Sequence, residues 1–597
     1  MIKCGNWNEQ LKLLLQVGNY ITDCVPTSVC IIYLFLEPCE RMPTTRRRAT
    51  SKKRAAAKSP KAAAKRKSTR SKKKAAAKKR TASKPRVTNA VAAAAKPVAK
   101  SPHAGKVDGP IKFSAPRGHL EIPIFVAVTT YFGYAILTLF GKIRDFFASL
   151  TGTGRYYGKS RKDGVAPLIN KTENFYDRRM YHRIQDVFNR PITGPPGAGK
   201  MKVLERESTD SNFSFKQTGN ELDVVNFGSY NYLGFADDWQ ETCAAEVLES
   251  FDDFGVGLCS APADAGFCKY HVQLENMMAE FLDKEACIVY NMGYGTNATT
   301  IPALMGKGCL VVSDSLNHTS LVNGIRASGS TVRVFKHDDA SHLEQVLRKS
   351  IVEGQPNRNR PWRKILVVCE GVYSMEGEIS HLKEIVQVCK KYRAYVYLDE
   401  AHSIGAMGPT GRGITEHAGV DTADIDIMMG TFTKSFGGMG GYIVGSKDLI
   451  NHLRENAGGS VYGMSMAPAI CKQIIRALEI IMHEKVGQKK IKALKDNSNY
   501  FRDGLTKLGL QVLGDYDSPV MPILLYNPTK IAAFSRECLK RGLAVVSVGF
   551  PATPVISSRA RFCVSAGHTK ENLDFALKVI DEVAEFMNLR YARSWSG

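Results

Sequence analysis

The sequence predicts an α/β enzyme built on a mostly parallel sheet, and two observations carry this prediction. From about residue 226 onward, short β-branched runs alternate with amphipathic stretches of helical spacing. Strands that alternate with helices in this way form parallel sheets covered by helices on both faces. Polar or glycine-rich segments follow these runs directly, and sheets of this class bind ligands beyond the carboxyl ends of their strands.

The positive charge of the chain is concentrated in one segment. Of 597 residues, 44% are hydrophobic and 23% are charged, and the formal net charge is +25. Residues 46–100 contain 22 Lys and Arg and no Asp or Glu, which leaves 60 basic and 57 acidic residues elsewhere. The remainder is therefore nearly neutral, which argues against a basic nucleic-acid-binding fold.

The 14 cysteines are scattered, without a CxxC pair or a Cys/His cluster at zinc-ligand spacing. This pattern argues against a disulfide scaffold and a structural zinc site. We expect reduced core thiols and no metal.

The N-terminal part divides into three predicted segments. Residues 1–41 include an apolar stretch at 25–36, which is either a targeting or anchor segment or sequence upstream of a start at Met42. Residues 42–115 form a Lys/Ala-rich tail that cannot build a core, and we expect it to be disordered. Such a tail suits nucleic-acid phosphates, an anionic membrane surface or a solvated spacer.

A membrane-anchoring helix is predicted at residues 116–150. Residues 122–141 carry no formal charge, and Arg117, Lys142 and Arg144 flank them. About 20 apolar residues at about 1.5 Å each span the roughly 30 Å of a bilayer core. A tilted span and an interfacial amphipathic helix both fit this composition, and a buried globular helix is the alternative.

The segments that follow the strand-like runs together supply the groups that can hold one cofactor. They lie at residues 291–297, 314–318, 370–377, 399–403 and 430–437. The amine of Lys434 can hold an aldehyde cofactor as a Schiff base, and the carboxylate of Asp399 can keep a pyridine nitrogen protonated. A glycine turn with hydroxyls can hold a phosphate, and the imidazole of His318 can cover the ring. Pyridoxal phosphate requires the lysine amine, the Asp carboxylate and the glycine turn with hydroxyls.

Several peptides then resemble one family. Residues 399–413 (DEAHSIGAMGPTGRG) and 430–442 (GTFTKSFGGMGGY) resemble the α-oxoamine synthases, pyridoxal-phosphate enzymes that condense an amino acid with an acyl-CoA and lose CO2. The resemblance is closest to the catalytic second subunit of eukaryotic serine palmitoyltransferase, through NFGSYNYLGFA, EGVYSMEGE, VGFPATP, SRARFCVSAGHTKE and FYDRRMYHRIQDVFNRP. It covers about residues 121–592.

The resemblance implies an aspartate-aminotransferase-like fold. A large cofactor domain is expected at 226–464, a smaller C-terminal α/β domain at 465–597, and an N-terminal helical and strand extension at 151–225.

The family also assigns roles to residues. It makes Lys434 the Schiff-base lysine and catalytic base, and Asp399 the partner of the pyridine nitrogen. It places His402 at the ring phenolate oxygen and His318 on the ring face. The remaining implied cofactor contacts are Gly293, Tyr294, Thr431, Thr433 and Ser374, and the implied substrate contacts are Arg561, for the amino-acid carboxylate, and Asn231.

The implied activity is the first step of sphingolipid synthesis, in which L-serine and palmitoyl-CoA give 3-ketodihydrosphingosine. The expected partner is a related subunit that lacks the lysine. The expected location is the endoplasmic reticulum membrane, with the catalytic domain facing the cytosol. Nucleic-acid binding by the tail stays open.

The sequence departs from the family at three points. After Gly257 the family has Ser or Thr followed by Arg, whereas here residues 258–262 read LCSAP, and the next loop, ADAGFCK, also differs. In homodimeric relatives a Thr or Ser near Ser465 reaches the phosphate of the partner, but Gly463 and Met464 precede Ser465 here. The last departure favours a heterodimer.

Two alternatives remain. One is a glycine-using relative such as 5-aminolevulinate synthase or glycine C-acetyltransferase. The other is a chromatin-binding protein with a degenerate enzyme fold, against which the intact set of Lys434, Asp399, His402 and His318 argues.

Overall fold

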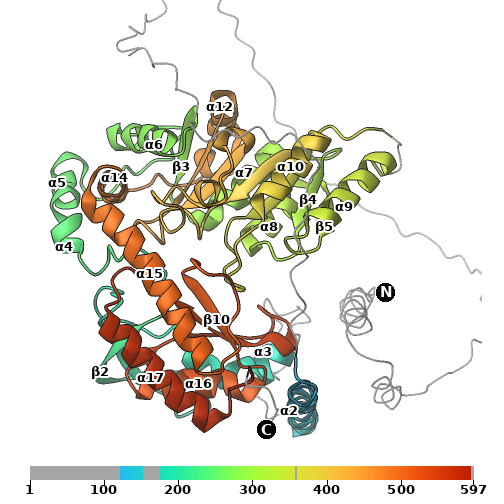
Figure 1. Cartoon of the computed structure of the whole chain (residues 1–597), viewed down its shortest axis with the longest axis vertical. Helices are drawn as coiled ribbons and strands as arrows, with labels where there is room; N and C mark the ends of the chain where they lie inside the picture. Colours follow the sequence, from blue (N-terminus) through green and yellow to red (C-terminus); the bar gives the residue numbers. More distant parts are fainter. Residues whose placement is uncertain (1–121, 152–174, 357–359, 593–597) are drawn as a thin grey trace, which may run out of the picture. The chain divides into compact units, whose positions relative to one another are not determined.

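The structure is a computed structural model that describes residues 122–151, 175–356 and 360–592. Within these ranges it contains a large domain around a seven-stranded sheet, a smaller domain, and an N-terminal helix (Figure 1). The predicted tail and the segment at 1–41 lie outside the described residues.

The central sheet has the strand order β3-β9-β8-β7-β6-β4-β5. Its strands are β3 (Ala286–Tyr290), β4 (Leu310–Asp314), β5 (Thr331–Phe335), β6 (Ile365–Glu370), β7 (Tyr395–Asp399), β8 (Ile427–Thr431) and β9 (Gly441–Gly445). Only β9 runs antiparallel to its neighbours, β3 and β8. The predicted mostly parallel sheet is therefore confirmed.

Helices cover both faces of this sheet because alternate strand residues point to opposite sides. In β6, Leu366 and Val368 belong to one hydrophobic cluster, and Val367 and Cys369 belong to another. The helices of the large domain are α4 (Trp239–Thr242), α5 (Ala244–Phe254), α6 (Lys269–Phe281), α7 (Gly293–Leu304), α8 (Thr319–Ser328), α9 (Ala340–Glu353), α10 (Leu382–Tyr392), α11 (Ile414–Ala418), α12 (Lys447–Asn456) and α13 (Gly458–Val461).

The smaller domain has its own core. An antiparallel sheet, β10-β13-β12, packs with the helices α15, α16 and α17 around a separate hydrophobic cluster. The elements are α15 (Lys485–Lys507), β10 (Val520–Leu524), α16 (Pro528–Lys540), β11 (Leu543–Ala544), β12 (Val546–Val548), β13 (Arg559–Cys563) and α17 (Lys570–Met587).

The division between the domains differs from the expected boundary at residue 465. Helix α14 (Pro468–His483) packs on α5 and α6 of the large domain. In α15, Ile491 and Leu494 belong to the large-domain cluster, whereas Phe501 and Leu505 belong to the small-domain cluster. The division therefore lies within α15, which bridges both cores.

The N-terminal extension joins the smaller domain. Strand β2 (Lys216–Asn226) pairs antiparallel with β1 (Met201–Glu207) and parallel with β11. Two short helices, α3 (Phe175–Arg179) and the 3-10 helix η2 (Tyr181–Val187), precede these strands.

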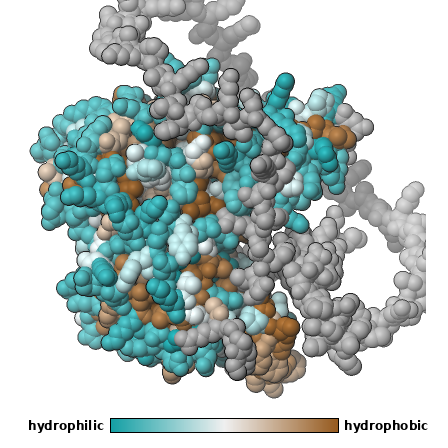
Figure 2. Space-filling view, in the orientation of Figure 1, coloured by the Kyte–Doolittle hydropathy of each residue, from teal (hydrophilic) through white to brown (hydrophobic). Residues whose placement is uncertain are grey.

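Helix α2 (Ile124–Thr151) docks on the smaller domain along one face. Thr130 and Gly141 are buried, and a Cβ at Gly141 would lie 2.6 Å from the Phe175 ring. At the other end of the helix, Arg179 Nε donates to Asp145 at 2.7 Å. The opposite face is apolar and exposed, and Figure 2 shows it as a brown surface at the position of α2. Residues 124–148 are long and apolar enough to cross a membrane.

Candidate active site

The candidate site lies at the carboxyl edge of the central sheet. Asp399 ends β7, Thr431 ends β8, and Lys434 follows in the next turn. Helix α7 begins at Gly293 directly after β3, and His318 is the N-cap of α8. Parallel strands bring these chain-distant segments to one edge, as the sequence predicted.

Asp399 is a buried carboxylate held by two donors. It is 3% exposed. Asn297 Nδ2 donates to its Oδ2 at 2.7 Å, and the Ala401 N–H donates to its Oδ1 at 2.9 Å. Hydrogen bonds of this kind stabilise the charged form of a carboxyl group. The Tyr397 hydroxyl donates to Asn297 Oδ1 at 2.7 Å, which fixes the orientation of the amide. Sequence reasoning missed Asn297, although it ends the glycine-rich segment after β3.

Glu370 lies beside Asp399 on β6, in register with it. Burial, and then the charge of Asp399, raise the pKa of Glu370 well above its ordinary value. This direction of the shift favours the protonated form of Glu370. The backbone N–H of His318 donates to Glu370, so Glu370 also fixes the turn that carries His318.

Lys434 has an unusually acidic ammonium group. Burial lowers its pKa to about 8, although the nearby Asp399 carboxylate opposes this effect. A sizeable fraction of the amine is therefore neutral near pH 7, as a nucleophilic or basic lysine requires. Its Nζ lies 5.4 Å from the centroid of the Tyr230 ring.

His402 is a buried neutral imidazole. Burial and the cation of Lys434 lower its pKa well below the ordinary value. Its Nδ1 lies 2.7 Å from the hydroxyl of Tyr232, whose pKa burial raises well above 10. Tyr232 therefore keeps its proton and can donate a hydrogen bond to Nδ1; in that tautomer the imidazole N–H lies on Nε2. Nε2 can then donate to an oxygen atom of a ligand.

His318 is exposed, in keeping with a ring that faces a ligand site. Its Nδ1 lies 2.7 Å from Ser320 Oγ, and its ring meets that of Tyr294 edge to face at 6.1 Å. Ser320 also accepts from Asn297 at 3.0 Å. The hydrogen bonds that hold His318 and Asp399 therefore belong to one network, through Ser320 and Asn297.

The start of α7 forms a cradle for an anion. The first hydrogen bond of the helix runs from the Thr296 N–H to the Met292 carbonyl at 2.9 Å, so the preceding N–H groups are free of intrahelical partners. A Cβ at Gly293 would lie 2.7 Å from Thr431 Oγ1, so only glycine permits this approach. Thr431 Oγ1 lies 2.9 Å from Thr433 Oγ1. Two hydroxyls and a helix N-terminus fit the phosphate of pyridoxal phosphate.

Arg561 lies on β13 and is 5% exposed. Its guanidinium lies 4.8 Å from the Tyr230 ring centroid, and its Nη1 lies 3.5 Å from the Ser374 carbonyl. Its Nε is buried and has no hydrogen-bond partner among the described residues. A buried guanidinium with an unused donor suits an incoming carboxylate. The backbone carbonyl of Ser374, a residue expected at the cofactor, lies next to Arg561.

Asn231 braces its own loop. Its Nδ2 donates to Asp237 Oδ2 at 2.8 Å, and its Oδ1 accepts from the Ala236 N–H at 3.2 Å. The adjacent Tyr230, which the sequence did not single out, has its ring near both Lys434 and Arg561. Tyr230 therefore joins Lys434 and Arg561, and the substrate contact expected of Asn231 stays a prediction.

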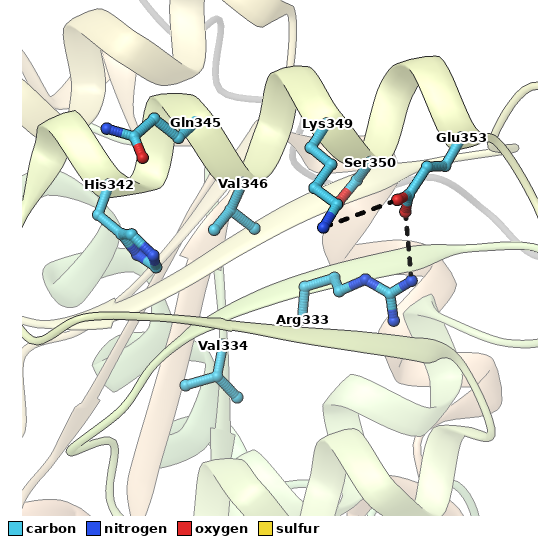
Figure 3. A pocket seen from close by; sticks show the side chains of 8 residues that line it. All are labelled: Arg333, Val334, His342, Gln345, Val346, Lys349, Ser350 and Glu353. Atoms are coloured by element: carbon cyan, nitrogen blue, oxygen red, sulfur yellow. Dashed lines mark ion pairs between the residues drawn. The ribbon is translucent and has the colours of Figure 1, made fainter. Parts of the chain in front are cut away.

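A pocket of about 380 Å³ lies elsewhere, between β5 and α9 (Figure 3). Glu353 pairs there with Arg333 at 3.6 Å and with Lys349 at 3.9 Å. None of the site residues named above lines this pocket, and we assign it no role.

Comparisons with known proteins agree with this arrangement. The sequence model of the class I and II aminotransferases matches residues 222–580. Long chain base biosynthesis protein 2a of Arabidopsis thaliana is 53% identical over 475 residues, which cover 79% of this chain and 96% of that protein. Serine palmitoyltransferase 3 of Homo sapiens is 48% identical over 480 residues, which cover 79% of this chain and 86% of that protein.

Solved structures agree as well. The serine palmitoyltransferase of Sphingomonas wittichii superposes with a TM-score of 0.63 at 27% identity, covering 71% of this chain and 99% of that one. A structure of a serine palmitoyltransferase with pyridoxal phosphate gives a TM-score of 0.61 at 27% identity. The match covers 68% of this chain and 94% of that chain.

Proposed function

The chain belongs to the class I and II aminotransferase family and, within it, to the serine palmitoyltransferases, and from this premise we propose the roles of its residues and partners. It is a pyridoxal-phosphate enzyme. Its reaction joins L-serine to palmitoyl-CoA, releases CO2 and coenzyme A, and gives 3-ketodihydrosphingosine. The observation that carries this assignment is the Tyr230 ring, which has Lys434 and Arg561 within 5.4 and 4.8 Å of its centroid.

When bound, pyridoxal phosphate supplies an aldehyde carbon and a protonated ring that draws electrons from the α-carbon of the substrate. Asp399 would accept a hydrogen bond from the ring N–H, and His402 Nε2 would donate one to the phenolate oxygen. His318 would cover the ring. The first turn of α7, with Thr431 and Thr433, would hold the phosphate.

Arg561 and Lys434 act on the substrate. Arg561 takes the serine carboxylate and so orients the bonds at Cα. The neutral amine of Lys434 accepts the Cα proton and later returns a proton to the same carbon. The electron pair left on Cα attacks the thioester carbon, the thiolate of coenzyme A leaves, and the carboxylate leaves as CO2.

We also propose a related, non-catalytic subunit as partner. Large apolar side chains of the large domain are exposed, among them Tyr462 at 85% and Val256 at 79%. Such side chains are available to a protein partner. The Ser465 hydroxyl donates to the Ser260 carbonyl of its own chain at 2.7 Å. Because Ser465 is engaged in this way, it does not serve the phosphate of a partner, which agrees with a partner that has no active site.

Product assays test function and partner together. The chain co-expressed with a related subunit that lacks the lysine is expected to form 3-ketodihydrosphingosine from L-serine and palmitoyl-CoA, and the chain alone is expected to form little. L-serine should also change the visible absorbance of the cofactor, and glycine should hardly change it. Activity with glycine in place of serine would contradict the substrate assignment, and full activity of the isolated chain would contradict the partner.

We further propose that α2 lies in the interface of the endoplasmic reticulum membrane, with the catalytic domain in the cytosol. The contacts of α2 at Thr130, Gly141 and Asp145 keep one face against the smaller domain. A helix that is held by a folded domain at a few points of one face and exposes apolar side chains on the other suits an interfacial position. The cysteines of the described part of the chain are unpaired, which suits the reducing cytosol.

Vesicle flotation tests this attachment. Replacing the exposed Phe125, Phe132 and Phe146 of α2 with serine removes three of the large apolar side chains available to lipid, and binding should fall about 100-fold. The matched control is Phe586→Ser, which alters an exposed phenylalanine on α17. Deleting residues 1–115 should weaken binding to anionic vesicles only. Unchanged binding of the triple variant would contradict the proposal.

A further inference from the structure

We propose that His337 is a positioning residue, which holds Arg561 in place by clamping the loop at residues 371–380 to the end of β4. The proposal rests on the function proposed above, because it takes Arg561 as the receptor for the serine carboxylate. The clamp itself consists of contacts between described residues, none of which belongs to the cofactor site.

His337 lies between two carboxylates. Its Nδ1 lies 3.0 Å from Asp314 Oδ1 at the end of β4, and its Nε2 lies 2.9 Å from Glu378 Oε2 in the loop. Its side chain is 12% exposed, and its ring meets Tyr373 edge to face at 4.3 Å. Both ring nitrogens face acceptors, so only the imidazolium form donates to both.

The same loop contacts β13 on its other side. Arg559 Nη1 donates to the Met375 carbonyl at 2.6 Å and lies 3.2 Å from Glu376 Oε1. Arg561 Nη1 approaches the Ser374 carbonyl at 3.5 Å and Met375 Sδ at 3.8 Å. The position of the guanidinium therefore depends on the position of the loop.

The loop has little room to move toward the smaller domain. Gly377 has a φ of +71°, and a Cβ there would lie 2.3 Å from the Val520 carbonyl. The Ile379 N–H donates to Asp515 Oδ2 at 2.8 Å. The smaller domain fixes this side of the loop. On the sheet side, the pairs of His337 with Asp314 and Glu378 join the middle of the loop to the end of β4, while hydrogen bonds from Gly371 to the Asp399 carbonyl and from Ser380 to Asp338 hold the two ends of the loop.

The charges around His337 favour its protonated form. Burial by itself lowers the pKa of His337, but the hydrogen bonds to Asp314 and Glu378 outweigh burial and raise the pKa to about 10. Glu376 adds a further negative charge nearby, which Arg559 balances, and the Tyr373 hydroxyl stays neutral because burial raises its pKa. The imidazolium therefore persists at physiological pH.

A neutral imidazole at this position can donate to one of the two carboxylates at most, and the single amide nitrogen of a glutamine does not replace two ring nitrogens that face opposite acceptors. The other carboxylate then lacks its donor, and the loop is held to the sheet less firmly. Because Arg561 follows the loop, we expect weaker capture of the serine carboxylate, with little effect on the acyl-CoA.

The test compares His337→Gln with wild type in the assembled enzyme. The KM for serine should rise about 10-fold, while kcat and the KM for palmitoyl-CoA should change less than about 3-fold. The matched control is His381→Gln, which breaks a similar pair, His381 Nδ1 to Asp338 Oδ2 at 2.7 Å, in the following turn. This control should leave all three constants near wild type.

A second measurement needs no substrate. The folded pKa of His337 lies above its unfolded value of about 6.5, so its stabilisation is complete below pH 6.5 and is lost as the pH rises through about 10. The melting temperature of wild type should exceed that of His337→Gln at pH 6.5, and the difference should close by about pH 10.

The kinetic and melting measurements separate a positioning role of His337 from a merely structural one. A proportional loss of kcat and of both KM values, or a pH-independent melting difference, would overturn the positioning role. If serine is not the substrate, the kinetic test fails for wild type too, whereas the pH-dependent melting difference still reports the clamp.

Discussion

Lys434→Ala is expected to lower kcat by about 10³-fold or more, since it removes both the nucleophilic amine and the base at the substrate α-carbon. The pKa of about 8 at Lys434 supports this expectation, because a buried amine that loses its proton near neutral pH can accept one from carbon. Substrate binding should persist, because Arg561 and the α7 cradle are unchanged. The measurement is product formation at saturating serine and palmitoyl-CoA.

A buried lysine elsewhere provides the control for Lys434→Ala. Lys284 also has a pKa lowered by burial, and its Nζ donates to the Ile425 carbonyl at 2.6 Å, away from the site. Lys284→Met is expected to lower the melting temperature and to leave kcat per folded enzyme near wild type. Added methylamine should partly restore Lys434→Ala and should not affect Lys284→Met. More than one tenth of wild-type activity in Lys434→Ala would remove Lys434 from the mechanism.

Local patterns were sufficient for five of the seven strands of the central sheet, β3, β4, β6, β7 and β8. Strands such as β4 and β6 are continuous runs of β-branched or aliphatic residues that end in Asp314 and Glu370, and such runs are typical of parallel strands buried on both faces. Strand β9 was not expected as a separate element, because its residues Gly441 and Tyr442 belong to the glycine-rich motif after Lys434. Its antiparallel direction follows from that tight turn, which folds the chain back beside β8.

Side chains at strand ends could be predicted, whereas the contacts that position them could not. Asp399 and Lys434 each follow a recognisable run of strand residues. Asn297, which donates to Asp399, is 102 residues away in the chain. Tyr230 likewise reaches Arg561 only through the packing of the two domains. Such pairs depend on the register of the sheet and on the docking of the smaller domain, which leave no periodic signal in the sequence.

Asp399→Asn is the second change with a large expected effect. One of its side-chain positions becomes an amide N–H, which then faces the donor Asn297 Nδ2 or the donor Ala401 N–H. The negative charge that would hold the ring N–H is also lost. We expect kcat to fall about 10²- to 10³-fold. The control is Asp426→Asn, since Asp426 Oδ2 accepts from the Val396 N–H at 2.8 Å near the start of β7 and lies away from the site.

The pH dependence separates an electrostatic effect from loss of folding. Asp399 is the first of the charges that raise the pKa of Lys434 against burial. Removing that carboxylate lowers the pKa of Lys434 below about 8, so its amine is neutral at lower pH. The acid limb of the pH profile of kcat in Asp399→Asn should therefore move to lower pH, even though its maximum falls. An unshifted limb would show that Asp399 and Lys434 do not share a site, because two charges that act on one ring cannot titrate independently.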